Sequence, residues 1–157
     1  ASAGYPEYPQ VIPVKIPIAS DDMVAYGLGQ ILTVKGWSSL RPYRLVTLRG
    51  VKEVEALGSE YHVEYVNLSD QAFKMVDAGR ADLAIFSRGA MCTPYLLGLR
   101  RIRIQEPAIQ KLYFYHHLHL RHESWVPRIE EQLARMQKDG SLQRLQDAAR
   151  KRWLNCQ

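Results

Sequence analysis

The sequence predicts an α/β fold in which a largely parallel sheet is flanked by helices, and two observations carry this prediction. Between residues 44 and 104, short apolar runs alternate with amphipathic segments in the order strand, helix, strand, helix, strand. Two of the helical segments stop at Gly58 and Gly79. A glycine suits such a stop, because it adopts the left-handed backbone that ends a helix without the steric cost of a Cβ.

Composition limits the classes of protein to which the chain can belong. It has 157 residues, of which 46% are hydrophobic, enough for one domain or two small lobes with a packed core. No apolar run approaches the roughly 18 residues of a membrane span. The net charge of +5 favours anionic ligands or is simply a solvated positive surface. The second interpretation is preferred and no nucleic-acid partner is expected, because no basic stripe is interleaved with aromatic residues.

The first segment is expected to be extended. Prolines forbid a helix in residues 5–17, at Pro6, Pro9, Pro13 and Pro17. Residues 23–28 (MVAYGL) form a strand candidate, and residues 20–22 between them favour a turn. Residues 37–40 predict a brief helical turn capped by a serine.

The middle of the chain carries the strand–helix alternation. Ser69 caps its central helix, and the buried stripe of that helix is expected at Ala72, Phe73, Met75 and Val76. The strands are expected at residues 44–50, 62–67, 81–86 and 101–104, and the helices at residues 51–57, 70–78 and 88–99.

The last third predicts a strand and two helices. Residues 111–120 form an aromatic strand candidate. Ser124 caps a helix over residues 126–138, with Pro127 in its first turn and a stop at Asp139-Gly140. Ser141 opens the last helix, whose inward side chains are expected to be Leu142, Leu145, Ala149 and Trp153.

Four motifs together resemble a known family. They are the proline-rich lead YPQVIPVKIPIASDDMVAY, the strand and glycine LVTLRG, the helix-to-strand joint AFKMVDAGRADLAIF, and the tail LARMQKDGSLQRLQDAARKRW. In this order they resemble the bacterial periplasmic solute-binding proteins of the polar amino-acid ABC-transporter type (family 3). The resemblance covers residues 5–154.

The resemblance implies two α/β lobes that are joined by crossing hinge strands and close on a small ligand. Residues 44–104 resemble the second lobe, and residues 1–43 an extended lead and hinge-strand segment that enters it. Residues 105–157 resemble the return strand and the two C-terminal helices. The opening strands and helices of the first lobe have no counterpart in this sequence. The family implies a periplasmic location and a membrane transporter or receptor as partner.

The resemblance also implies a ligand site at two strand ends. In the family a glycine after the first strand of the second lobe opens a helix whose N–H groups hold a ligand carboxylate. Arg49, Gly50 and Val51 occupy that place, where the family usually has a hydroxyl residue after the glycine. Ser87 stands where the family commonly has an aspartate that binds an ammonium group, and Arg88 follows it. Because Arg88 would repel an ammonium, the expected ligand is a small anionic or neutral solute. The alternatives are that Gly50 is only a turn glycine and that Arg88 is a solvated residue at a helix start.

Catalytic motifs and cofactor motifs are not found in the sequence. It has no nucleophile elbow, no phosphate loop and no His-Glu-x-x-His. A dehydratase using Glu53 and Glu55 is the weakest hypothesis, because a solvated helix start explains these residues better. His117 and His119 share one strand face, but two imidazoles are not a metal site, and the further donors His122 and Glu123 lie past the strand end. No enzyme, cofactor or metal is therefore expected.

Two features bear on the cellular compartment. Cys92 and Cys156 either pair in an oxidising compartment or remain two buried thiols. The small residues Ala1-Ser2-Ala3-Gly4 are like those around a signal-peptidase site.

Two functional hypotheses follow. The first is a non-enzymatic solute-binding protein, acting as the binding component of a transporter or as a sensory input. The second is an interaction or assembly protein that dimerises or swaps strands, because half a lobe is missing and the apolar surface left behind needs cover.

Overall fold

The computed structural model describes residues 6–156, so the expectation for Ala1 to Gly4 lies outside the described residues. The strands of the described chain are β1 (Val11–Leu28), β2 (Arg44–Leu48), β3 (His62–Val66), β4 (Leu83–Ser87) and β5 (Ile102–His119). Its helices are α1 (Lys52–Glu55), α2 (Ser69–Asp77), α3 (Cys92–Leu96), α4 (Val126–Lys138) and α5 (Ser141–Trp153), with 3-10 turns at Trp37–Leu40, Arg88–Met91 and Leu120–Trp125. None of the helices in this range is long and apolar enough to cross a bilayer.

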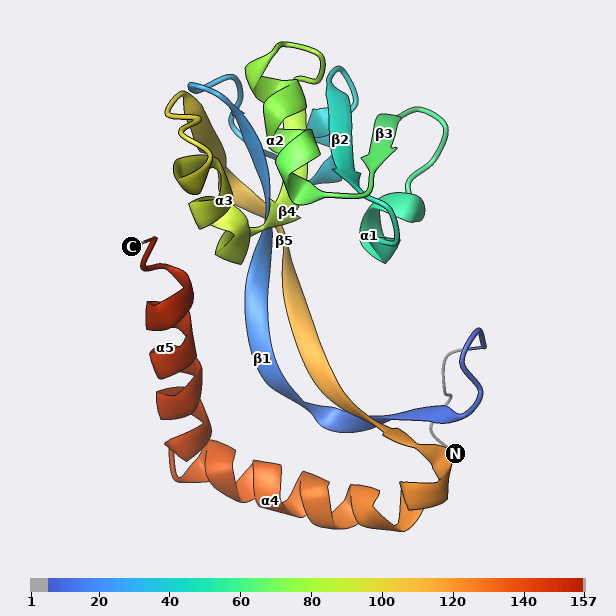
Figure 1. The fold of residues 1–157 in the computed structure, drawn as a ribbon. Helices are drawn as coiled ribbons and strands as arrows, with labels where there is room; N and C mark the ends of the chain where they lie inside the picture. Colours follow the sequence, from blue (N-terminus) through green and yellow to red (C-terminus); the bar gives the residue numbers. More distant parts are fainter. Residues whose placement is uncertain (1–5, 157) are drawn as a thin grey trace. The chain divides into compact units, whose positions relative to one another are not determined.

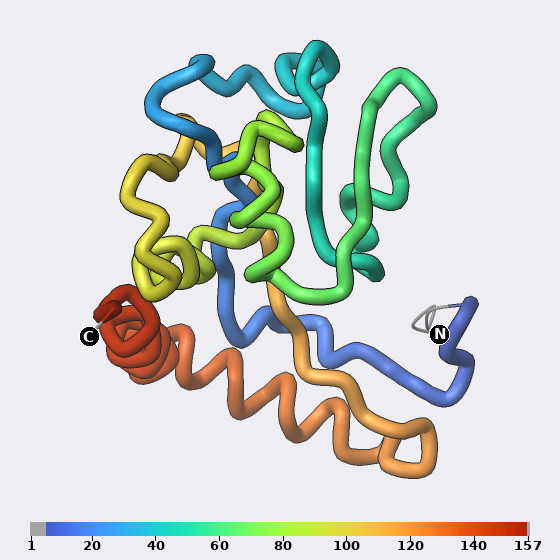
Figure 2. The backbone as a smooth tube through the Cα atoms, turned by 45° about the horizontal axis from the view of Figure 1, so that its top comes forward, coloured from blue at the N-terminus to red at the C-terminus, as the bar shows by residue number. Residues whose placement is uncertain are grey.

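The strands form one sheet in the order β3-β2-β4-β1-β5 (Figure 1). β2 is parallel to both β3 and β4, whereas β1 pairs with β4 in the antiparallel direction. The prediction of an α/β fold with a parallel sheet and flanking helices is confirmed. Figure 2 shows β2 and β3 running side by side before the chain returns through α2.

The chain divides into two compact units. Of the described residues, the sheet unit comprises residues 21–111 and 153–156, and the ribbon unit comprises residues 6–20 and 112–152. The chain therefore passes between the units within β1, within β5 and near the end of α5.

The core of the sheet unit forms where α2 packs on β2 and β4. Phe73 is fully buried, with its ring edge-on to Tyr26 at 5.2 Å and stacked on Phe86 at 5.0 Å. Ala72 and Val76 complete the predicted stripe, while Met75 is only partly buried. After α2, Gly79 has a φ of +72° and turns the chain into β4, as predicted.

The ribbon unit has a smaller core of its own. Val14 of β1, Leu133 of α4 and Leu142 of α5 are its buried residues. The side-chain amide of Gln146 donates a hydrogen bond to the carbonyl of Ile18 at 2.8 Å, which fixes α5 to the strand. Apolar side chains of α4 and α5 thus cover one face of the strands in the ribbon unit.

Two predicted interruptions of the long strands are wrong. Residues 20–22 are not a turn, because Asp21 and Asp22 lie inside the continuous strand β1, where their carboxylates have hydrogen-bond partners. The strands expected at residues 101–104 and 111–120 are one strand, β5. Pro107 does not interrupt it, because β5 is at the edge of the sheet, where a residue without an N–H is tolerated.

Several local expectations at helix ends and faces are also wrong. No serine side chain caps the turn at Trp37–Leu40, α2 or α4, whose N-cap residues are Gly36, Leu68 and Trp125. On α5, Leu145 and Trp153 are about 60% exposed, because the ribbon unit is covered by the first turns of that helix.

Candidate functional site

The two predicted binding loops lie at the same edge of the sheet. β2 and β4 are adjacent and parallel, with Val46 opposite Ala84, so their carboxyl ends point the same way. The buried hydroxyl of Thr47 donates to the carbonyl of Ile85 at 2.7 Å and ties the strands together near these ends. Ser87 is the last residue of β4 and Gly50 lies two residues past the end of β2, at the edge where ligands of open α/β sheets bind.

In the first loop, the amide of Gly50 already has a partner. Gly50 has a φ of +90°, and its N–H donates to the carboxylate of Glu55 at 2.8 Å. Glu55 also pairs with Lys52 at 3.4 Å, so it closes the four-residue helix α1. Arg49 next to Gly50 is exposed, and its guanidinium has no partner among the described residues.

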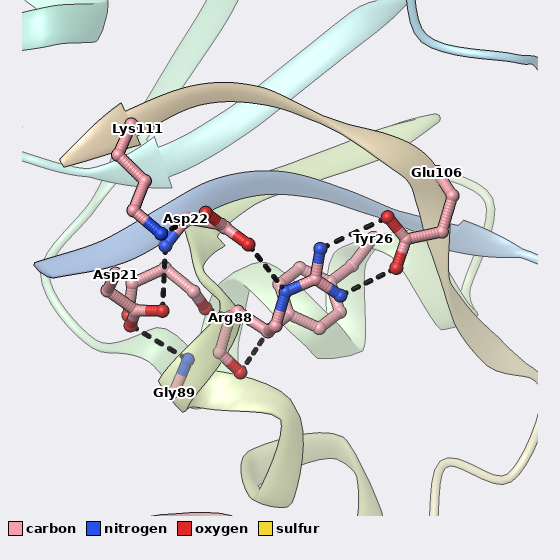
Figure 3. Close-up of polar contacts among 8 residues, drawn as sticks. Asp21, Asp22, Tyr26, Arg88, Gly89, Glu106 and Lys111 are labelled. Atoms are coloured by element: carbon pink, nitrogen blue, oxygen red, sulfur yellow. Dashed lines mark hydrogen bonds and ion pairs between the residues drawn. The ribbon is translucent and has the colours of Figure 1, made fainter. Parts of the chain in front are cut away.

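In the second loop, the backbone is held from β1 (Figure 3). The hydroxyl of Tyr26 donates to the carbonyls of Ser87 at 2.8 Å and Arg88 at 3.2 Å. The carboxylate of Asp21 accepts the N–H of Gly89 at 3.0 Å. The Ser87–Gly89 turn is thus positioned by two side chains of the neighbouring strand.

Arg88 is ion-paired on both sides of its guanidinium, as Figure 3 shows. Its Nη1 and Nη2 donate to the two carboxylate oxygens of Glu106, at 2.6 and 3.1 Å. Its Nε donates to Asp22 at 3.1 Å, and Lys111 reaches the other oxygen of Asp22 at 3.3 Å. We call Asp21, Asp22, Arg88, Glu106 and Lys111 the Arg88 network. Its three carboxylates outnumber its two cations.

The network shifts the protonation equilibria of its members. Hydrogen bonding from Arg88 holds the pKa of Glu106 below its usual range. Partial burial raises the pKa of Asp22, but hydrogen bonds from Arg88 and Lys111 lower that pKa by more, so the net shift is downward. Burial and the nearby charge of Asp21 raise the pKa of Tyr26, which therefore remains a hydrogen-bond donor.

Sequence reasoning identified Arg88 but missed the residues that hold it. Asp21, Asp22 and Tyr26 come from β1, and Glu106 and Lys111 from β5. One signal was available, because a pair of aspartates between two apolar runs of a strand requires partners. The identity of those partners depends on the order of the strands, which local patterns do not specify.

The histidine cluster lies at the end of β5 and in the 3-10 turn that follows it. Among residues 6–156, no three His, Cys, Asp or Glu side chains are grouped as metal ligands. His119 lies 3.1 Å from the side-chain oxygen of Gln10 and accepts the N–H of Arg121. His122 accepts a hydrogen bond from the guanidinium of Arg121 at 3.0 Å.

Cys92 and Cys156 are joined in a disulfide, which decides between the two alternatives left open by the sequence. The bond links the start of α3 to the residues that follow α5.

Comparison with known proteins finds similarity only between structures. No family model matches the sequence, and no curated protein is significantly similar to it. A histidine kinase sensor domain with similarity to periplasmic binding proteins has a TM-score of 0.71 at 18% identity, over 98% of this chain and 67% of that one. A probable amino-acid ABC transporter extracellular-binding protein of Bacillus subtilis has a TM-score of 0.70 at 17% identity, over 98% and 68%.

Two further structures have a similar fold. The ligand-binding core of GluR0 in complex with L-glutamate has a TM-score of 0.73 at 12% identity, over 98% of this chain and 69% of that one. For ArgBP from T. maritima the chain spans 63% of the other protein, at 15% identity and a TM-score of 0.65 over 90% of this chain. The predicted resemblance to solute-binding proteins is thereby confirmed at the level of the fold.

Proposed function

We propose that this protein is a non-enzymatic binding protein for a small solute that carries an anionic group, and that it serves a transporter or a sensory receptor. The observation that carries the proposal is the position of Arg88 at the carboxyl edge of the sheet, with its guanidinium held by strands β1 and β5. The structural neighbours support a binding role, since they are binding proteins and receptors.

In the proposed mode of binding, the anionic group of the solute replaces Glu106 on Arg88. The side chain of Glu106 is 57% exposed, so it can swing into solvent at small cost. Asp22 keeps its bond to Nε and holds the guanidinium in place. A planar guanidinium then binds a carboxylate through two parallel hydrogen bonds. Arg49, Gly50, Val51 and Ser87 form the rest of the proposed contact surface.

The disulfide supports a periplasmic or other oxidising location. Disulfides persist in such compartments and are rare where thiols are kept reduced. The structural neighbours, which include a sensor domain and a transporter's binding protein, support a small solute and a membrane transporter or receptor as partners.

Calorimetric titration with L-glutamate, L-glutamine and L-arginine tests the proposal. We expect L-glutamate to bind through its side-chain carboxylate, with its ammonium group turned away from Arg88, and Arg88→Ala to abolish the signal while the folded fraction is unchanged. Glu106→Gln removes the competing charge and should raise the affinity about tenfold, equivalent to about 1.4 kcal/mol. Glu60→Gln is the matched control, because Glu60 pairs with the exposed Arg41, at 3.6 Å, and is not part of the Arg88 network. Unchanged affinity in Arg88→Ala would exclude Arg88 from the site.

An assembly role is the second candidate, and a specific surface favours it. Tyr113, Phe114 and Tyr115 of β5 are 57%, 46% and 37% exposed, and β5 is an edge strand of the sheet. An exposed aromatic edge strand is a template for pairing with another chain. Light scattering separates the two roles: a homodimer whose melting temperature is indifferent to every solute favours assembly over binding.

A further inference from the structure

A cavity of about 450 Å³ opens in the sheet unit, and none of the residues of the contact surface proposed above lines it. Its walls are mainly apolar and come from the end of β1, from η2 (Arg88–Met91) and α3, and from the first residues of β5. Met91, Pro94, Leu99, Ile102 and Ile104 supply aliphatic surface, together with the ring of Tyr26. A volume of this size lies within the range of small-molecule sites, about 300–1,000 Å³.

Two cationic side chains, Arg100 and Arg103, also line the cavity. The guanidinium carbon of Arg100 lies 4.1 Å from the ring centroid of Tyr95, which also lines the cavity. Nη1 of Arg103 donates to the carbonyls of Arg100 at 2.6 Å and Ile102 at 2.9 Å, so one end of its guanidinium is fixed by the backbone. No Asp or Glu is among the residues that line the cavity. Both positive charges therefore lack a carboxylate in the cavity.

We propose that this cavity binds a small amphiphilic carboxylate, of which a medium-chain fatty acid is the simplest form. The aliphatic walls bury the hydrocarbon chain, which is favourable because apolar surface is removed from water. The guanidinium groups of Arg100 and Arg103 donate charge-assisted hydrogen bonds to the carboxylate. A fully polar solute is disfavoured, because the walls offer it few hydrogen-bond partners.

The site is independent of the proposed function, because it uses neither Arg88 nor the loop at residues 49–51. Tyr26 is the residue shared by the two places: its ring lines the cavity and its hydroxyl holds the carbonyls of Ser87 and Arg88. The variant Arg88→Ala should therefore leave binding at the cavity intact, which distinguishes failure of one proposal from failure of the other.

Titration of the full chain with decanoate, decan-1-ol and butyrate tests the proposal. We expect saturable decanoate binding that is at least about tenfold tighter than binding of decan-1-ol, which lacks the charge, or of butyrate, which lacks the long chain. The double variant R100Q/R103Q should lose the preference for decanoate. Arg101→Gln is its matched control, because Arg101 pairs with Asp77 at 3.2 Å and does not line the cavity.

A second pair of variants tests whether decanoate binds in this cavity, without altering the charge of the protein. Met91→Trp fills part of the cavity and should weaken decanoate binding, whereas Leu96→Trp on the exposed side of α3 should not. Met91 is 37% exposed and Leu96 71%, so both substitutions are compatible with the fold. Equal affinity of the wild-type chain for decanoate and decan-1-ol would overturn the proposal. Sedimentation with phosphatidylglycerol vesicles in the absence of saturable decanoate binding would also overturn it, and would assign these residues to a lipid surface.

Discussion

Glu106 accepts hydrogen bonds from Arg88 with both of its carboxylate oxygens, at 2.6 and 3.1 Å. Arg88 follows β4 and Glu106 belongs to β5, and in the sheet β1 lies between these two strands. The guanidinium thus spans the intervening strand and takes Asp22 from it as a third contact. A side chain that joins three strands stabilises the sheet edge and, in the proposed function, is the group for which a solute must compete.

The first prediction concerns pH. The pKa values of Glu106 and Asp22 are lowered in the folded state, so their contribution to stability is present above their unfolded-state pKa values of about 4. It is lost as the pH falls through the lowered values. We expect the melting temperature to fall on acidification from about pH 5 to about pH 3, and less steeply in Arg88→Met.

Thermal denaturation followed by circular dichroism across this range measures the effect. Some slope should remain in the variant, because Arg44 also lowers the pKa of Asp82 through a hydrogen bond. Equal slopes for the two proteins would show that Arg88 does not stabilise these carboxylates.

The second prediction concerns the disulfide between Cys92 and Cys156. It closes a loop with a sequence separation of 64, and cross-links of this kind typically stabilise a fold by about 2–4 kcal/mol through the unfolded state. The C92A/C156A variant should be destabilised by about this amount in urea unfolding. A reductant should lower the stability of the wild-type chain and leave that of the variant unchanged, and a reductant effect of equal size in both would contradict the assignment.

The elements of the sheet unit were predictable because each is encoded locally. The stripe of α2, the stop at Gly79 and the apolar run of β4 lie within 20 residues of one another, and each has a simple physical rule. The parallel direction of β2, β3 and β4 followed from the same alternation, whereas their order in the sheet was not predicted.

The strands that carry the Arg88 network were harder to predict. β1 and β5 each have 18 residues, and each contains residues that favour turns, such as Asp21 and Pro107. Tertiary pairing overrides those preferences, because Asp21 bonds to Gly89 and Pro107 lies in an edge strand. The sequence therefore predicted only part of the candidate site. It predicted the loops after two strands, but not the carboxylates that bind Arg88, because these come from distant strands.

The third prediction concerns the core. Phe73 is fully buried between Tyr26 and Phe86, at 5.2 and 5.0 Å between ring centroids. Phe73→Ala should cost about 3–5 kcal/mol, from lost burial and the cavity that remains. Leu68→Ala at the N-cap of the same helix is the control. Leu68 is 62% exposed, so its substitution should change the stability by less than about 0.5 kcal/mol. Urea unfolding distinguishes them, and a similar cost for both would contradict the packing described.

The fourth prediction separates the two proposed sites through Tyr26. Tyr26→Phe removes the hydroxyl that donates to the carbonyls of Ser87 and Arg88, but keeps the ring that lines the proposed decanoate cavity. We expect a loss of about 1–3 kcal/mol in the free energy of unfolding, because partly buried carbonyl groups lose a donor. The Ser87–Gly89 turn should loosen, so binding of L-glutamate should weaken while binding of decanoate stays within about twofold of the wild-type value. Parallel titrations of the variant with the two probes provide the measurement. If L-glutamate binding were unaffected, the hydroxyl of Tyr26 would have no part in positioning Arg88.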